Sequence, residues 1–332
     1  MPAYNAAPFI LQAIDSVLQQ SFTDFELIVI NDGSTDNTGA LVAALDDPRI
    51  RLVHNDGNRG LIYTRNLGVE LARGEFIAYL DSDDAAFPQR MEKQLTYLQR
   101  RPDLVAVGAW AQPMDAQGHY RNFFWRYPGN SEFVKATLLF RAYINTSTFF
   151  IRADVMKQLK FSPHHELGED YDLYMRCVKR YKVENIPEVL IAFRLHATSI
   201  TKTKVDLLAK NLNEISVRAL NDLGLAPTPE EIALHRYIEW LGSSDDPQIF
   251  EKTNAWLNKI LAANARSAQY DAAALRHAVA ERWFAVCYAN THFGWRALMA
   301  FRRGPLAAGG MVTATQYAKF FIKSLARTVR PT

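Results

Sequence analysis

Short apolar runs alternate with segments of helical periodicity over residues 25–107 of this 332-residue chain. The runs are short and rich in β-branched residues, which is typical of buried parallel strands. Strands that alternate with helices predict right-handed βαβ units, and therefore an α/β fold with a mostly parallel sheet flanked by helices. The predicted strands are residues 25–30, 50–53, 75–80 and 104–107, and the helices between them are a stretch ending at Leu45, residues 60–72 and residues 88–100.

In the rest of the chain, strands and helices are both predicted up to about residue 203, and only helices are predicted beyond it. Strands are predicted over residues 145–151 and 189–195, and helices over residues 154–159 and 169–180. A chain of this length corresponds to about two domains. We therefore expect an α/β domain over residues 1–203 and a helical C-terminal region over residues 204–332.

The composition excludes several classes of protein. The chain is 48% hydrophobic and 22% charged, which rules out a disordered or collagen-like chain. Its two cysteines, Cys177 and Cys287, form no metal or redox motif and favour free thiols in a reducing compartment. No stretch approaches the ~18 apolar residues of a membrane-spanning helix, and no signal peptide opens the chain. We therefore expect a cytoplasmic protein.

Charge is distributed unevenly along the sequence. Residues 1–200 contain 21 Lys and Arg against 24 Asp and Glu, whereas residues 201–332 contain 17 against 11. The acidic balance of the first part disfavours binding to nucleic acid. The basic balance of the second part indicates a different partner there.

Residues 312–332 are expected to form a basic amphipathic helix. Its basic stripe comprises Lys319, Lys323, Arg327 and Arg330, and the opposite side carries Tyr317, Phe320, Phe321 and Leu325. This pattern suits a helix that lies in an anionic membrane surface, and so predicts peripheral contact with the inner face of the plasma membrane. The alternative is a helix that packs on the rest of the chain and leaves a solvated basic face.

Polar clusters follow two of the predicted strands. Ligands of open parallel sheets bind beyond the carboxyl ends of the strands. One cluster is residues 31–34, with Asp32 at the strand end, and taken alone it is more simply read as a turn and helix cap. The second cluster, residues 81–84, contains three carboxylates, of which Asp81 and Asp83 point the same way in an extended segment. Such a cluster suits Mg²⁺ or Mn²⁺ held together with phosphate oxygens, although an acidic solvated loop is the alternative.

Two further segments contain candidate functional residues. Glu169 and Asp170 begin a predicted helix, where acids also serve simply to complement the helix dipole. His196 follows the strand at 189–195, and it is either a metal ligand or an ordinary hydrogen-bonded histidine.

Taken together, these segments resemble a family 2 glycosyltransferase with the GT-A fold. The resemblance covers roughly residues 1–200 and rests on six elements in the family's order. They are residues 1–5, the turn at 32–36, residues 58–60 with Arg65, Asn66 and Gly68, residues 74–84, the pair Glu169-Asp170, and residues 194–199.

The resemblance implies a role for each matching residue. Asp32 would bind the base of a nucleotide, usually uracil, and Asp83 would ligate a Mn²⁺ or Mg²⁺ ion together with His196. Asp170 would be the catalytic base. The remaining residues implied in donor binding are Pro2, Ala3, Tyr4 and Asn5 beside the base, Arg65 near the diphosphate, Asp81 near the ribose, and Ser82.

The resemblance also implies an activity. We expect an inverting transfer of sugar from a nucleotide-sugar donor, most simply a UDP-sugar, to a hydroxyl of a glycan or lipid-linked acceptor. The setting would be the synthesis of bacterial cell-surface polysaccharide. The Gln-x-x-Arg-Trp signature of processive synthases is absent after Asp170, which indicates a non-processive enzyme.

Other classes fit the residues less well. A non-catalytic nucleotide-sugar-binding relative is the main alternative, although all the expected acids are present. An aspartyl phosphatase expects Thr or Val where Ala85 stands. A nucleotidyltransferase expects a glycine-rich loop where residues 4–7 lie.

The start of the chain carries one more expectation. In the family, a short apolar strand precedes the segment that begins at Pro2, whereas only Met1 stands before it in this sequence. We therefore expect that the natural first strand is missing because of a misplaced start codon. The alternative is that residues 1–5 form only the loop beside the nucleotide.

Overall fold

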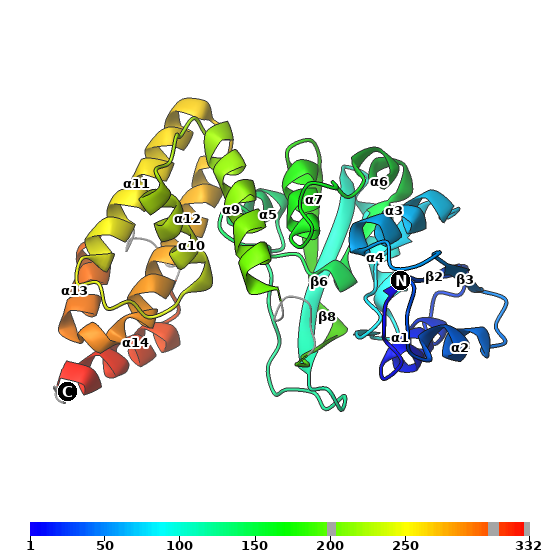
Figure 1. Ribbon diagram of the computed structural model, residues 1–332. Coiled ribbons are helices and arrows are strands. Elements are labelled where there is room, and N and C mark those ends of the chain that lie inside the picture. Colours follow the sequence, from blue (N-terminus) through cyan, green and yellow to red (C-terminus); the bar gives the residue numbers. More distant parts are fainter. Residues whose placement is uncertain (198–203, 305–311, 329–332) are drawn as a thin grey trace. The chain divides into compact units, whose positions relative to one another are not determined.

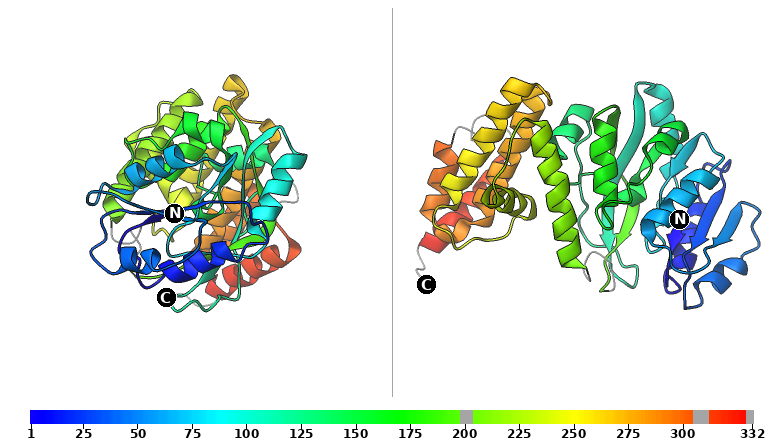
Figure 2. Two further views of the ribbon diagram at one scale, coloured as in Figure 1. Left: turned by 90° about the vertical axis from the view of Figure 1, so that its right-hand side faces the viewer. Right: turned by 45° about the horizontal axis from the view of Figure 1, so that its top comes forward.

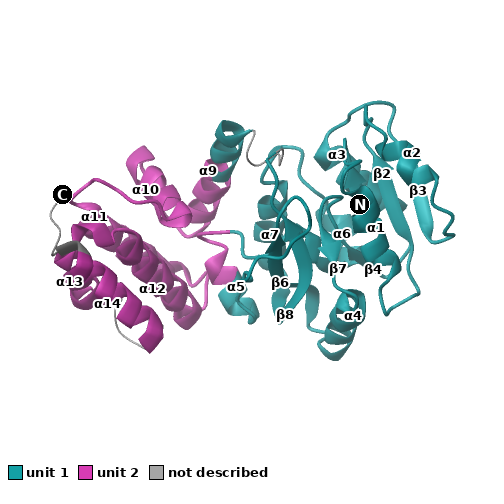
Figure 3. Ribbon diagram, turned by 90° about the horizontal axis from the view of Figure 1, so that it is seen from below, with its two compact units in different colours: residues 1–134, 142–212 teal, residues 135–141, 213–332 magenta. Residues whose placement is uncertain are grey.

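The computed structural model describes residues 1–197, 204–304 and 312–328. The chain forms two compact units, shown in different colours in Figure 3. Unit 1 comprises residues 1–134 and 142–212, and unit 2 comprises residues 135–141 and 213–332. Helix α9 (Val205–Asp222) contributes residues to both units, since the division falls after Leu212.

The first sheet of unit 1 is parallel, with strand order β1-β2-β3. Its strands are β1 (Pro2–Ala3), β2 (Leu27–Asn31) and β3 (Ile50–His54). Every residue of the central strand β2 is buried, as its apolar sequence predicts. The short strand β1 pairs with the end of β2, in the register Pro2 with Ile30 and Ala3 with Asn31.

The second sheet of unit 1 has the order β4-β7-β6-β8-β5. Long strands β6 and β8 run parallel beside each other (Figure 1), whereas β4, β5 and β7 pair antiparallel. The predicted parallel pairing is therefore confirmed in the first sheet and in the β6–β8 pair, whereas the second sheet as a whole is mixed. Strand β5 is only two residues long, too short to leave an apolar run in the sequence. The bounds are β4 (Phe76–Ala78), β5 (Ala85–Ala86), β6 (Leu104–Met114), β7 (Phe150–Arg152) and β8 (Lys182–Arg194).

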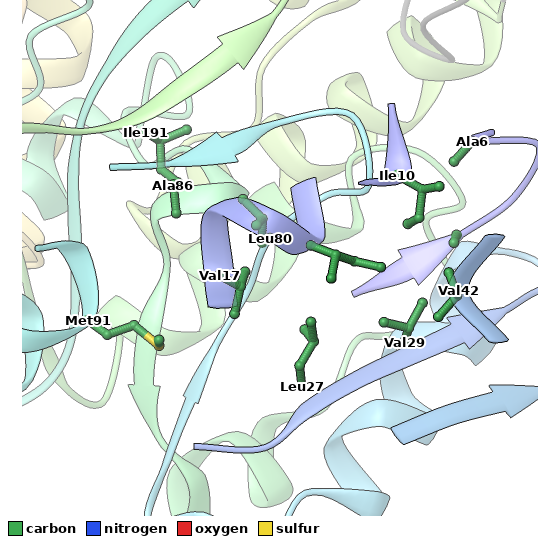
Figure 4. Close-up of a cluster of buried hydrophobic side chains, with 12 residues drawn as sticks. Ala6, Ile10, Val17, Leu27, Val29, Val42, Leu80, Ala86, Met91 and Ile191 are labelled. Atoms are coloured by element: carbon green, nitrogen blue, oxygen red, sulfur yellow. The ribbon is translucent and has the colours of Figure 1, made fainter. Parts of the chain in front are cut away.

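One apolar core joins the two sheets of unit 1. Leu27 and Val29 of the first sheet and Ile191 of the second belong to the same buried cluster, together with Ile10 and Val17 of helix α1 (Figure 4). The helices of unit 1 are α1 (Ile10–Leu18), α2 (Thr38–Ala43), α3 (Leu61–Leu71), α4 (Arg90–Arg100), α5 (Ser131–Thr137, shared with unit 2), α6 (Ala153–Leu159) and α7 (Glu169–Val178).

Two of the predicted strands have different bounds in the structure. Residues 146–148 form the 3₁₀ turn η1 (Thr146–Thr148) because the side chain of Asn145 accepts the N–H of Ser147, which leaves only β7 as strand. Strand β8 begins at Lys182, seven residues before the predicted start at residue 189. Pro187 hides this extension in the sequence, and it lies where the pairing with β6 shifts, because a proline is tolerated at a bulge.

Unit 2 is helical, as the sequence predicts for the C-terminal region. Helices α11 and α12 pack along each other and are the yellow and orange helices of Figure 2. Within the described ranges, no helix combines the length and apolar character needed to span a bilayer. Besides α9, the bounds are α10 (Pro229–Trp240), α11 (Ile249–Ser267), α12 (Ala272–Ala289), η2 (Thr291–Phe293), α13 (Trp295–Arg303) and α14 (Ala314–Thr328).

A buried histidine joins three segments of unit 2. Nε2 of His235 lies 2.9 Å from the carbonyl oxygen of Leu139, and Trp256 donates its Nε1–H to Nδ1 of His235 at 3.2 Å. The Nε2 atom therefore carries the proton. Burial lowers the pKa of His235 to about 4, so the imidazole is neutral in the folded protein.

Candidate active site

The carboxylate of Asp32 lies at the carboxyl end of β2 and is buried. It accepts hydrogen bonds from Nδ2 of Asn55 at 2.6 Å and from the backbone N–H groups of Arg59 at 2.8 Å and Gly60 at 3.0 Å. Asp32 therefore fixes the loop that follows β3. An ionised carboxylate has about four acceptor positions, so one remains beyond these three bonds.

Gly33 allows the turn after Asp32 to approach this loop closely. Its φ is +69°, and a Cβ atom there would stand 2.4 Å from the carbonyl carbon of Gly57. Only glycine fits such a position without displacing backbone.

The N-terminal loop packs directly against the same turn. The backbone N–H of Asp32 donates to the carbonyl of Ala3 at 2.9 Å, and Oδ1 of Asn5 accepts the N–H of Thr35 at 2.8 Å. The Tyr4 side chain is 48% exposed. The structure thus brings together residues 2–5 and Asp32, for which the family resemblance implies binding of a nucleotide base.

Arg65 connects the acids of two further segments. This buried residue of α3 donates from Nη2 to Oδ1 of Asp81 at 2.9 Å and from Nη1 to Oε1 of Glu169. Burial disfavours the charged guanidinium, but the carboxylates of Asp81 and Glu169 outweigh burial and raise the pKa of Arg65. For Glu169, burial has the larger effect: it raises the pKa to about 7, although the Arg65 cation opposes this shift.

Asp170 is half-buried in the first turn of α7, and its side chain is held from two sides. Thr146 donates its hydroxyl to Oδ2 of Asp170 at 2.9 Å, and the backbone N–H of Tyr171 donates to Oδ1 at 2.7 Å. The buried Tyr174 hydroxyl in turn donates to Thr146 at 3.1 Å. The carboxylate is therefore oriented by groups that leave it accessible.

Asp83 and His196 form a contacting pair in another part of the site. Nε2 of His196 lies 2.8 Å from Oδ2 of Asp83, and the imidazole packs at 5.0 Å against the ring of Phe9. Burial and the neighbouring Asp81 carboxylate raise the pKa of Asp83, against the effect of His196. Ser82, between the two acids, is half-buried, and Thr198 and Ser199 of the predicted segment lie outside the described residues.

A buried group of residues holds these acids in place. Asp84 accepts the Ser147 hydroxyl at 2.5 Å and the backbone N–H of Arg194 at 2.8 Å, while Ser147 also accepts the N–H of Asp81 at 3.1 Å. Nε of Arg194 donates to the carbonyl oxygen of Asp83 at 2.7 Å. Thr146 and Ser147 are not among the predicted site residues, although three polar residues inside an otherwise apolar stretch could have marked residues 146–148. Arg194 is included only as the start of the segment 194–199.

The candidate residues form one connected network within unit 1. Asn55, bonded to Asp32, also donates to Thr64 at 3.1 Å, and Thr64 precedes Arg65 on α3. Arg65 then connects to Asp81 and Glu169, and the Thr146-Ser147 segment connects Asp170 to the Asp81–Asp84 turn. The residues predicted at separate strand ends are therefore neighbours.

The site offers few protein ligands for a metal ion. Across the parts of the chain that the structure describes, no group of three or more His, Cys, Asp or Glu side chains is arranged to hold one. The Asp83–His196 pair supplies one carboxylate oxygen and one imidazole nitrogen. That donor set fits Mn²⁺ or Mg²⁺, because these ions keep positions for phosphate oxygens and water.

The chain is similar to known glycosyltransferases. A model of glycosyl transferase family 2 matches residues 1–159. The putative colanic acid biosynthesis glycosyl transferase WcaA of Escherichia coli is 30% identical over 205 residues, which cover 57% of this chain and 70% of WcaA. The succinoglycan biosynthesis protein ExoO of Rhizobium meliloti is 34% identical over 217 residues, 60% of this chain and 61% of ExoO.

A solved structure shows the fold. The crystal structure of S. aureus TarS 1-349 in complex with UDP-GlcNAc matches with a TM-score of 0.56 and 17% identity, covering 99% of this chain and 90% of that one. This likeness confirms the α/β, GT-A fold predicted from the sequence. With the family model and the relatives, it follows that the chain is a glycosyltransferase and belongs to glycosyltransferase family 2.

Proposed function

We propose that this glycosyltransferase transfers a sugar, with inversion, from a UDP-sugar to a hydroxyl of a glycan or lipid-linked acceptor. The observation that carries the proposal is that hydrogen bonds and neighbouring positions in the chain connect Asp32, Arg65, Asp81 and Asp170 with the Asp83–His196 pair. Within unit 1, these residues supply groups that can bind a nucleotide base, a diphosphate, a metal ion and an acceptor hydroxyl.

The donor nucleotide binds at the first sheet in this proposal. Asp32 uses its remaining acceptor position for a base N–H, with residues Pro2, Ala3, Tyr4 and Asn5 beside it. Asp81 and Ser82 bind the ribose side of the donor. Arg65 lies near the diphosphate, but its guanidinium is largely used by Asp81 and Glu169, so we assign it the positioning of those acids.

Asp83 and His196 hold a Mn²⁺ or Mg²⁺ ion in this proposal. When bound, the ion offsets the negative charge that the leaving diphosphate gains in the transition state. Arg194 fixes the backbone of Asp83 and Phe9 supports the imidazole of His196, so both side chains are held by their protein neighbours.

Asp170 acts as the general base of the reaction. A carboxylate accepts the proton of an acceptor hydroxyl when it lies within hydrogen-bond reach. The Thr146 hydroxyl and the Tyr171 N–H hold the Asp170 carboxylate in one orientation, so its remaining acceptor positions face a fixed direction. One base and one leaving group suit a single in-line displacement, and hence inversion.

The relatives' names support the substrate class. TarS has been crystallised with UDP-GlcNAc, and ExoO and WcaA are named for the biosynthesis of polysaccharides. These names support a role in bacterial cell-surface polysaccharide synthesis. We further propose that the enzyme acts in the cytoplasm, with residues 312–332 in peripheral contact with an anionic membrane.

A screen of nucleotide sugars tests the proposal. The full chain is incubated with UDP-glucose, UDP-galactose, UDP-GlcNAc, GDP-mannose and dTDP-rhamnose in Mn²⁺, and release of the nucleoside diphosphate is measured. We expect slow release of UDP from at least one UDP-sugar and none from the GDP-sugar. Release from GDP-mannose or dTDP-rhamnose alone would overturn the assignment of the base, and binding of UDP-sugars without any turnover would favour a non-catalytic role.

A further inference from the structure

We infer that unit 2 binds the surface of an anionic membrane through the outer face of α14. We define this face as Phe321, Ile322, Leu325, Lys319 and Lys323. Its chemistry calls for a partner that accepts apolar side chains and supplies negative charge, and the headgroup region of an anionic bilayer does both. The inference gives the proposed membrane contact specific residues.

The inner face of α14 is already used for packing. Phe320 is fully buried, and its ring lies 5.6 Å from Phe284 of α12 and 5.7 Å from Phe301 of α13. Tyr317 packs at 6.3 Å against the same Phe301. The sequence pattern placed Tyr317 and Phe320 with Phe321 and Leu325 on one side, but the structure divides that side between core and solvent.

The outer face keeps large apolar side chains in water. Ile322 is 64% exposed, Phe321 39% and Leu325 36%. At about 100° of rotation per residue, these three side chains occupy one continuous arc next to the packed face. A contiguous exposed apolar patch on a helix marks a surface of interaction.

Basic side chains lie beside this arc, on the side away from the packed face. Lys319 and Lys323 follow it around the helix, and Lys323 lies over the ring of Tyr288, with its Nζ atom 4.6 Å from the ring centre. Arg302 and Arg303 are exposed on α13, the helix whose Phe301 contacts α14. The side chain of Arg327 and all of Arg330 lie outside the described residues.

The charge balance distinguishes a membrane from a second copy of the chain. No Asp or Glu occurs after Glu281 in the sequence. Two copies that met through their α14 faces would bring basic residues together with no acid from this part of the chain to offset them. An anionic lipid surface attracts the same residues, and their long side chains can keep the charges at the headgroups.

Vesicle flotation of the full chain tests the inference. Vesicles of phosphatidylcholine with 30% phosphatidylglycerol are compared with pure phosphatidylcholine. We expect flotation only with the anionic vesicles, weakened by 0.5 M salt. The double variant Phe321→Ser/Ile322→Ser should lower the bound fraction at least tenfold, and Lys319→Gln should also lower it.

Matched controls separate this surface from general stickiness. Trp240→Ser removes an exposed aromatic from α10, and Arg266→Gln removes a basic side chain from α11, so both should float like the unchanged chain. All the substituted side chains are exposed, and equal melting temperatures verify that each variant is folded.

Three outcomes would overturn the inference. They are no flotation of the full chain, equal flotation of the double variant, and a lipid-independent dimer in size-exclusion chromatography that the double variant abolishes. The last result would assign the face to a second copy. UDP release in the absence of vesicles does not depend on this face, so failure of the membrane contact and failure of the proposed donor chemistry are distinguishable.

Discussion

Nε2 of His196 lies 2.8 Å from Oδ2 of Asp83, although the two residues stand 113 positions apart in the chain. Arg194 explains how this pair is built. Its backbone N–H binds Asp84, its Nε binds the carbonyl of Asp83, and it lies only two residues before His196. The end of β8 is therefore fastened to the acidic turn after β4, which presents the two side chains to each other.

Removing the Asp83 carboxylate should abolish metal-supported turnover. Asp83→Ala keeps the backbone carbonyl that Arg194 binds, so we expect an unchanged circular dichroism spectrum and loss of UDP release in Mn²⁺ or Mg²⁺. The matched control is Asp24→Ala, which removes an exposed acid from the same unit. Full activity in EDTA, or in Asp83→Ala, would refute the role of this residue.

Neutralising Asp170 should separate chemistry from binding. Asp170→Asn preserves the shape and the contact with Thr146 but removes the basic carboxylate, so transfer should fall by about 10²–10⁴ while affinity for the UDP-sugar persists. Isothermal titration and initial rates measure the two quantities. Asp206→Asn, an exposed acid on α9, serves as the control. An equal loss of affinity and rate would make Asp170 a binding residue instead.

Adding a methyl group at Gly33 should loosen the base-side loop. The new Cβ would meet the backbone of Gly57 at 2.4 Å in addition to the strain of a positive φ, so we expect Gly33→Ala to lower the free energy of unfolding by at least about 2 kcal/mol and to weaken UDP binding. Gly118 has a similar positive φ, but a Cβ atom there would stand no closer than 3.6 Å to another residue. Gly118→Ala should therefore lower the free energy of unfolding by only about 1 kcal/mol. Urea titration of both variants checks the difference, and equal losses would show that the close approach is unimportant.

His235 should make unit 2 sensitive to acid. Its pKa is lowered by burial from 6.5 to about 4, so the unfolded chain binds a proton in this interval while the folded chain does not. The stability contributed by neutral His235 is complete above pH 6.5 and is lost as the pH falls to 4, on the order of 3 kcal/mol in total. NMR titration should give a midpoint near 4, and His235→Gln should show less acid destabilisation than the unchanged chain. A midpoint near 6.5 would contradict the burial of this imidazole.

Much of the first sheet and of the candidate site could be predicted from the sequence. Strand β2 is an apolar run with Asp32 at its end, and the Asp81–Asp84 turn follows another such run, so their placement depends on local pattern. The helix that begins at Glu169 was likewise recognisable from its own residues. These features are local, so the residues of each segment are enough to predict it.

The parts that escaped prediction depend on contacts between distant segments. Thr146 and Ser147 matter only because Asp170 and Asp84 reach them from other elements. The side of α14 that packs could not be read from its periodicity, because Phe320 and Phe321 are equally apolar and only the neighbouring helices decide which is buried.

Measuring the binding of Mn²⁺ with and without UDP tests directly whether Asp83 and His196 hold an ion together with a diphosphate. We expect weak binding of Mn²⁺ alone, tighter binding in the presence of UDP, and a loss of affinity of about tenfold or more in His196→Ala and in Asp83→Ala. The exposed His164→Ala control should bind like the unchanged chain. Binding of Mn²⁺ that is indifferent to UDP, or that survives both substitutions, would contradict the account.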